Sequence, residues 1–226
     1  MMHPITFHDL NTAFAQVKAN QGCAGIDQVT IAQFEAELWA NLSALEAELA
    51  DERYQPLPLL RIEVDKGKDN GETRSLSIPA VRDRVAQTTV LHRIEPILEQ
   101  EFEDCSYAYR KGRSVRQAVQ QIMELHELGY QWVADADIDD FFNQVEHELL
   151  LEKLRRHIDD SGIIRLVQQW LRAEVWDGNF LTVIERGIPQ GSPLSPVLAN
   201  LFLDELDEAM LRSGFAYVRY SQSNIK

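Results

Sequence analysis

Four aspartates stand between an apolar run and two aromatic residues, within residues 132–142 of this chain. Side chains alternate along a strand, so Asp135, Asp137 and Asp139 would share one face of a strand that begins near residue 130. Carboxylates crowded at the end of a buried strand are costly unless a positive group lies among them, and a divalent metal ion is the usual group. A solvated acidic turn is the alternative. This stretch alone leaves both interpretations open.

The charge of the whole chain argues against a nucleic-acid partner. The formal net charge is −14, and proteins that bind nucleic acids usually carry a basic surface. The basic residues are unevenly distributed, however, because residues 74–116 hold eight of the 22 lysines and arginines. A basic surface can therefore form despite the acidic total. These eight residues are Arg74, Arg82, Arg84, Arg93, Arg110, Lys111, Arg113 and Arg116.

Length and composition indicate an ordinary globular protein. The 226 residues are enough for one large domain or two small lobes. The two cysteines lack the spacing of metal ligands, which favours a reducing compartment. A membrane span needs about 20 apolar residues, and the sequence offers no such run. We therefore expect a cytoplasmic protein without membrane contact.

Apolar spacing and turn residues predict an α+β fold. Helices are expected over residues 6–20, about 30–51, 79–102, 114–129, 147–158, 162–173 and 197–211. Two β-hairpins are expected, one formed by residues 59–65 and 73–78 and the other turning at 176–180. Further strands are expected over 130–134 and 217–220.

Five stretches resemble the reverse transcriptase family, in the branch typified by group II intron enzymes. Each is a weak signal by itself, but together they follow the order of the family across nearly the whole chain. Two of the regions, 103–110 and 130–138, also resemble the CRISPR-associated members, in which the enzyme accompanies a spacer-acquisition integrase. The five stretches are Gly25–Thr30, Arg74–Arg84, Cys105–Ser114, Ala136–His147 and Gly187–Asn200.

The resemblance implies a right-hand polymerase fold and RNA-directed DNA polymerase activity. Fingers with the first palm helix would occupy about residues 1–128, and an incomplete palm would occupy about residues 129–226. The palm would be an antiparallel sheet backed by helices, and the thumb would be absent. The expected partners are an RNA template, a DNA primer and a dNTP, with an intron RNA or a CRISPR integrase as a further partner.

The chemistry of the family is the transfer of a nucleotide from a dNTP to a primer 3′-hydroxyl. Two Mg²⁺ ions about 3.5–4 Å apart stabilise the charge on the attacking and leaving oxygens, and carboxylates hold these ions. By resemblance, Asp137 is the first metal-binding aspartate and the backbone carbonyl of Ile138 is a further ligand. Asp139 and Asp140 are then expected to flank the site.

The resemblance also assigns residues to the nucleotide and to the nucleic acid. Phe142 matches the aromatic gate that leaves no room for a 2′-hydroxyl, although Phe141 can equally be a core residue. Lys66 and Arg74 match the pair that grips the triphosphate. The residues expected beside the nucleotide are Gln190 and Gly191, and those expected on template or primer phosphates are Arg82, Arg110 and Arg113.

The sequence departs from the family after Tyr220. The second acidic motif of the family contains two adjacent aspartates, whereas this chain has Gln222 and Ser223 at those positions. A neutral amide and a hydroxyl cannot replace two carboxylates around divalent cations. We therefore expect a truncated enzyme with an incomplete two-ion site, inactive alone. The alternative is a non-catalytic nucleic-acid-binding remnant or a partner module of a CRISPR or mobile-element system.

Overall fold

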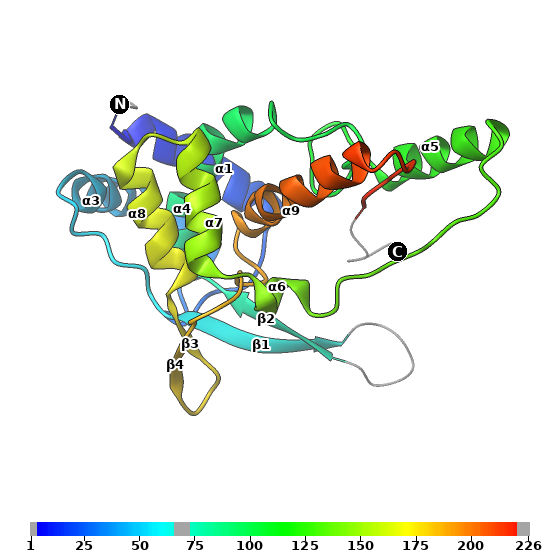
Figure 1. The fold of residues 1–226 in the computed structure, drawn as a ribbon. Coiled ribbons are helices and arrows are strands. Elements are labelled where there is room, and N and C mark those ends of the chain that lie inside the picture. Colours follow the sequence, from blue (N-terminus) through cyan, green and yellow to red (C-terminus); the bar gives the residue numbers. More distant parts are fainter. Residues whose placement is uncertain (1–3, 66–72, 221–226) are drawn as a thin grey trace.

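The computed structural model describes residues 4–65 and 73–220 (Figure 1). The first half contains α1 (Phe7–Asn20), α2 (Ile31–Ala36), α3 (Leu38–Ala50), β1 (Leu59–Asp65), β2 (Thr73–Ile78), α4 (Val81–Leu98) and α5 (Val115–Glu127). The second half contains α6 (Phe141–Gln144), α7 (His147–His157), α8 (Ser161–Leu171), β3 (Glu174–Trp176), β4 (Leu181–Val183) and α9 (Ser195–Arg212). The predicted α+β class is confirmed.

Side-chain caps fix where the N-terminal helices begin. Thr6 accepts a hydrogen bond from the backbone N–H of Asp9, and Thr30 does the same for Gln33. The single helix expected over residues 30–51 is interrupted at Glu37, whose backbone leaves the helical region. The Asn41 amide donates a hydrogen bond of 3.0 Å to the Phe34 carbonyl, so a carbonyl at the break keeps a partner.

Within the described residues, the sheet has four strands in the order β2-β1-β3-β4. β1 and β2 pair antiparallel, with Leu60 opposite Ile78, while β3 runs parallel to β1 through the pair Leu59 and Val175. Both expected hairpins are present, and the tip of the first lies outside the described residues. The Asp177 carboxylate closes the second turn by accepting two backbone N–H groups.

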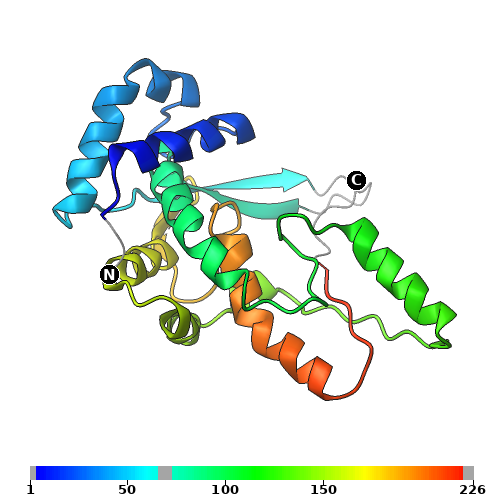
Figure 2. The same cartoon turned by 90° about the horizontal axis from the view of Figure 1, so that it is seen from above.

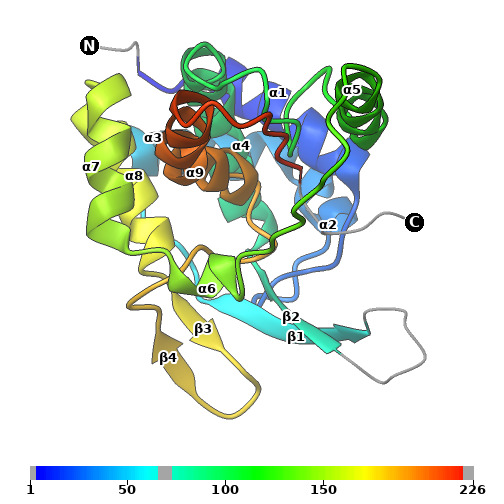
Figure 3. The ribbon, with the colours of Figure 1, turned by 45° about the vertical axis from the view of Figure 1, so that its right-hand side comes forward.

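Helices pack on one side of this sheet and form one continuous apolar core (Figures 1 and 2). α4 passes through the centre of the core, where Val85, Ala86, Val90 and Ile94 are fully buried. α1 packs against α4, and α7 packs against both α8 and α9. Figures 1 and 2 show α5 set apart from this helical body, and Figure 3 shows the chain running from α5 back to α6.

Two expected strands are absent from the described part of the chain. Residues 130–138 form an irregular segment, and residues 217–220 contribute only one isolated bridge, between Ser106 and Arg219. A strand is stable only beside a partner that takes up its backbone hydrogen bonds. In the described structure the two stretches do not pair with each other, so the alternating pattern does not produce a palm sheet here. The division into fingers and palm stays a prediction.

Candidate nucleotide-binding site

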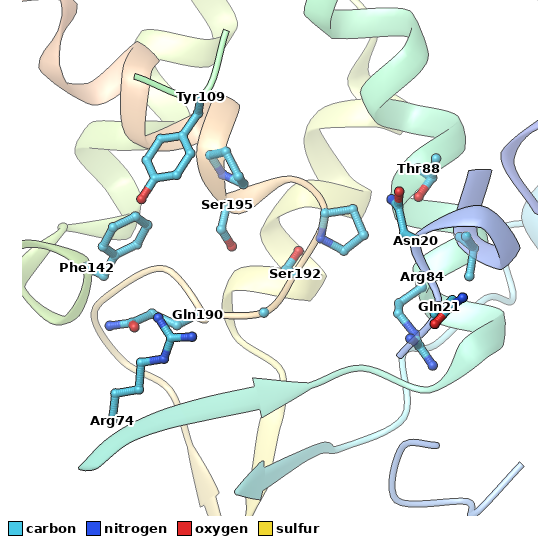
Figure 4. Close-up of a pocket in the computed structure, with 14 residues that line it drawn as sticks. Asn20, Gln21, Arg74, Arg84, Thr88, Tyr109, Phe142, Gln190, Ser192 and Ser195 are labelled. Atoms are coloured by element: carbon cyan, nitrogen blue, oxygen red, sulfur yellow. The ribbon is translucent and has the colours of Figure 1, made fainter. Parts of the chain in front are cut away.

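A pocket of about 440 Å³ opens between the sheet and the helical body (Figure 4). Its walls come from the C-terminal end of α1, from β2, α4 and α6, from the turn that contains Tyr109, and from the loop that leads into the start of α9. Segments far apart in the sequence therefore meet at one place. The lining residues are Val17, Asn20, Gln21, Arg74, Arg84, Thr88, Tyr109, Phe142, Gln190, Gly191, Ser192, Pro193, Ser195 and Pro196.

One wall is made by β2 and the loop of residues 187–194. The backbone N–H of Ser77 donates a hydrogen bond of 2.7 Å to the carbonyl of Gln190, so the loop extends the edge of β2 near Arg74. Gly191 has a φ of +119°, and a Cβ there would lie 2.9 Å from the Ser77 carbonyl oxygen. Only glycine fits this conformation and this approach. The buried Nε of Arg74 has no hydrogen-bond partner among the described residues.

The same loop also fixes Phe142. The backbone N–H of Ile188 donates to the Phe142 carbonyl at 2.7 Å, and that of Gly187 donates to the Val145 carbonyl at 2.7 Å. Phe142 lines the pocket, whereas Phe141 packs against Phe202 with ring centroids 6.0 Å apart. The two rings also contact each other edge to face, with centroids 5.5 Å apart, but among the two only Phe142 lines the pocket.

The opposite end of the pocket is polar. The sequence motifs did not indicate that the residues at this end form part of a site. Figure 4 shows Asn20, Gln21, Arg84 and Thr88 at this end, away from Arg74 and Phe142. Arg84 is only 8% exposed, and its guanidinium donates a hydrogen bond of 2.7 Å to the Cys23 carbonyl. Burial lowers the pKa of Arg84. Arg84 belongs to the basic segment of residues 74–116, but the sequence pattern does not reveal that its side chain points into this pocket.

The expected metal ligands lie elsewhere. Asp137 is exposed and lines a separate hollow of about 1140 Å³, between α5, residues 130–137 and residues 214–220. Ile138 is also exposed, on the same irregular segment. A carboxylate suits Mg²⁺ chemically, but the described residues contain no cluster of three or more histidine, cysteine or acidic side chains that could hold a metal. The described residues therefore do not fit a complete two-ion site.

The three arginines expected on nucleic acid make intramolecular contacts. Arg82 forms an ion pair of 2.5 Å with Glu48. Arg110 is buried, pairs with Glu99 and donates to several backbone carbonyls. Arg113 pairs with Asp104 and lies over the Tyr107 ring. These contacts support the fold around the pocket, and a role on template or primer stays a prediction. Lys66 lies outside the described residues.

The fold agrees with the comparison with known proteins. The chain belongs to the reverse transcriptase (RNA-dependent DNA polymerase) family, which it matches over residues 64–221. It is 36% identical over 188 residues to Protein YkfC of Escherichia coli K12, covering 81% of this chain and 49% of that protein. It is 30% identical over 215 residues to the group II intron-encoded protein LtrA of Lactococcus lactis, covering 94% of this chain and 35% of LtrA.

A solved structure supports the same family. A chain of a partial Cas6-RT-Cas1–Cas2 complex is 27% identical, with a TM-score of 0.60, and covers 94% of this chain and 35% of that chain. The predicted resemblance to the group II intron-like and CRISPR-associated branches is thus confirmed. The chain spans half or less of the length of these similar proteins. Among the described helices, none is both long and apolar enough to cross a membrane.

Proposed function

We propose that the pocket binds the incoming dNTP during RNA-directed DNA synthesis. The observation that carries the proposal is the meeting of Arg74, Phe142 and Gln190 in one pocket, from three segments that are distant in the sequence. Family membership gives the reaction class. The partners of the proposed reaction are an RNA template and a DNA primer.

Each wall suits one part of a nucleotide. The Arg74 guanidinium can donate paired hydrogen bonds to phosphate oxygens. The Phe142 ring presents a flat apolar surface, which suits the C2′ side of a deoxyribose and leaves no space for a 2′-hydroxyl. Gln190 supplies an amide beside the nucleotide, and the glycine that follows it brings the loop backbone close to β2. The pocket thereby combines charge recognition with exclusion by shape.

The metal requirement is a separate part of the proposal. The family generally uses Mg²⁺, which supplies charge stabilisation at the transferred phosphate when bound. Asp137, with the Ile138 carbonyl, is the proposed contribution of this chain. The described residues do not complete the ion site, so the proposed action of the pocket is the binding and selection of the nucleotide. Inactivity of this chain by itself remains an expectation.

Two contexts for synthesis are suggested by the similar proteins. LtrA is a group II intron-encoded protein. The similar solved chain belongs to a partial Cas6-RT-Cas1–Cas2 complex. An intron RNA or a CRISPR integrase is accordingly a proposed partner for this chain. The alternative function is nucleic-acid binding without catalysis.

Arg74→Ala tests the nucleotide site. Hydrogen bonds to charged groups contribute about 1.5–3 kcal/mol, so the variant should bind dTTP about 10- to 150-fold more weakly than the wild-type chain in calorimetric titration. Arg61→Ala is the matched control, because Arg61 lies on the same hairpin, is exposed, and does not line the pocket. Equal dTTP affinity in the wild type and the Arg74 variant contradicts the assignment.

A primer-extension assay on an RNA template separates catalysis from binding. Template-dependent DNA synthesis by the purified chain with Mg²⁺ and dNTPs supports polymerase function in this chain. Binding of dTTP without synthesis supports the non-catalytic alternative. A wild-type chain that neither binds dTTP nor extends the primer refutes the proposed function.

A further inference from the structure

We propose that Tyr109 is a further nucleotide-contacting residue, which forms a second aromatic wall with Phe142 and contacts the sugar of the bound nucleotide. This inference rests on the proposed function of the pocket and deepens it. Three observations support it: the conformation of the Tyr109 backbone, the contacts that hold its neighbours, and the position of its side chain.

The backbone of Tyr109 is in the left-handed region. Its φ is +54°, and only four other described non-glycine residues have a positive φ. For an L-residue this region costs about 1–2 kcal/mol relative to the right-handed helical region. A bulky residue held there is unusual, and such residues concentrate at binding and active sites. The conformation therefore requires both a cause in the surrounding structure and a reason to keep the tyrosine.

The cause is the anchoring of the residues on either side. On one side, the buried Asn200 amide of α9 donates a hydrogen bond of 2.8 Å to the Ala108 carbonyl. On the other side, the buried Arg110 guanidinium donates to Glu99 at 2.9 Å and to the Ser106 carbonyl at 2.9 Å. Residue 109 lies between these two fixed points. The turn that connects them directs the Tyr109 side chain away from the buried neighbours and towards the pocket.

The side chain points into the pocket. Figure 4 shows the Tyr109 ring entering from the side of α9, with its hydroxyl directed towards Phe142. The two residues line the same pocket as Arg74 and Gln190. Tyr109 is 42% exposed, although its neighbour Arg110 is buried. A tyrosine offers an apolar ring face and one polar group, which suits a sugar because a sugar has C–H faces and hydroxyls.

The side chain and the backbone conformation can be tested separately. We expect Tyr109→Ala to weaken dTTP binding by about 2- to 12-fold, the equivalent of one aromatic contact. It should also reduce the preference for dTTP over UTP, in the same direction as Phe142→Ala. Tyr109→Phe keeps the ring and loses the hydroxyl, so its affinity should lie between those of the wild type and the alanine variant.

Tyr109→Gly supplies a readout that a packing role would not produce. Glycine adopts a positive φ without strain, so this variant should gain thermal stability while it loses dTTP affinity. A gain of roughly 2–4 °C is expected for each kcal/mol of relieved strain in a chain of this size. Gln28→Gly is the matched control, because Gln28 has a φ of +59°, is exposed and does not line the pocket. It should gain stability and keep its dTTP affinity.

The outcomes distinguish this inference from the proposed function. If Arg74→Ala weakens dTTP binding while the alanine and glycine variants of Tyr109 bind dTTP as the wild type does, the inference is overturned and the proposed function stands. If the glycine variant loses both stability and affinity, Tyr109 is a packing residue and the inference also fails. If the wild-type chain binds no dTTP, the proposed function itself is refuted.

Discussion

His147 connects the helix that follows Phe142 to the loop that carries Gln190. Its Nε2 lies 2.7 Å from the Gly187 carbonyl oxygen, and because a carbonyl oxygen only accepts, Nε2 donates this hydrogen bond. Burial lowers the pKa of His147, although the hydrogen bond to Gly187 opposes this effect. The buried Nδ1 has no hydrogen-bond partner among the described residues. One side chain thus holds the backbone that contacts Phe142.

His147→Leu should destabilise the fold by about 1–3 kcal/mol, because the buried Gly187 carbonyl loses its donor. His147→Gln places an amide N–H near the position of Nε2 and should recover most of that loss. The lowered pKa means that the unfolded chain binds the proton first, so the wild type should lose stability relative to the glutamine variant as the pH falls below 6.5. Urea unfolding at several pH values measures both effects. Equal stability of the two variants contradicts this role.

Asp83 joins three elements near the start of the β1–β2 hairpin. Its carboxylate, at the start of α4, accepts hydrogen bonds of 2.7 Å from the Tyr54 hydroxyl and 3.0 Å from the Leu57 N–H, just before β1. The indole of Trp170 in α8 donates to the same tyrosine oxygen at 2.9 Å. Burial raises the pKa of Asp83 to about 6, although both of its hydrogen bonds oppose this effect.

Asp83→Asn should flatten the dependence of stability on pH. The raised pKa means that the native state holds this proton more tightly than the unfolded state, so its contribution is present at low pH and is lost as the pH rises from 3.8 to about 6. The free energy of unfolding of the wild type, relative to the variant, should fall by about 3 kcal/mol across this window. Denaturant titrations between pH 3.5 and pH 7 measure the difference. Parallel curves for the two proteins refute the assignment.

At the level of secondary structure, helices were easier to predict from the sequence than strands. Helices with regular apolar spacing, such as α7 and α8, were predicted within about two residues because their apolar faces meet a core. The alternation at 130–134 indicates which face a strand would bury, but it contains no information about whether a partner strand is present. The resemblance of the motifs to the family pointed to Arg74, Phe142, Gln190 and Gly191, and all four line the pocket. Tyr109 and Arg84 were missed as site residues, because their directions depend on a left-handed turn and on tertiary packing.

The whole molecule exposes an apolar region on the side of α5. Trp132 is 95% exposed and lines the hollow of about 1140 Å³ with Val133, Tyr130 and Phe215, each also exposed. Contiguous apolar surface of this kind favours association, even in a chain with a net charge of −14. We therefore expect the strand-like sequence at 130–134 to favour self-association of the chain, since it adds no strand to the described sheet.

Trp132→Ser should lower both the binding of a hydrophobic dye and the self-association of the chain, because it removes the most exposed ring of that hollow. Trp39→Ser is the control, since Trp39 is 75% exposed but lies on α3 and does not line the hollow. Dye fluorescence and sedimentation velocity give the two measurements. The idea is wrong if both variants behave alike.

The loop that pairs with Ser77 and with Phe142 has a consequence for the dimensions of the pocket. Its hydrogen bonds attach Gln190 to β2 and Ile188 to the carbonyl of Phe142, so the short segment from residue 188 to residue 190 sets the spacing of the two walls. The loop therefore determines the width of the pocket between Arg74 and Phe142. The chemistry of each wall and the distance between them are separate variables, so a change in loop length would alter the size of the accepted molecule while both recognition groups were retained.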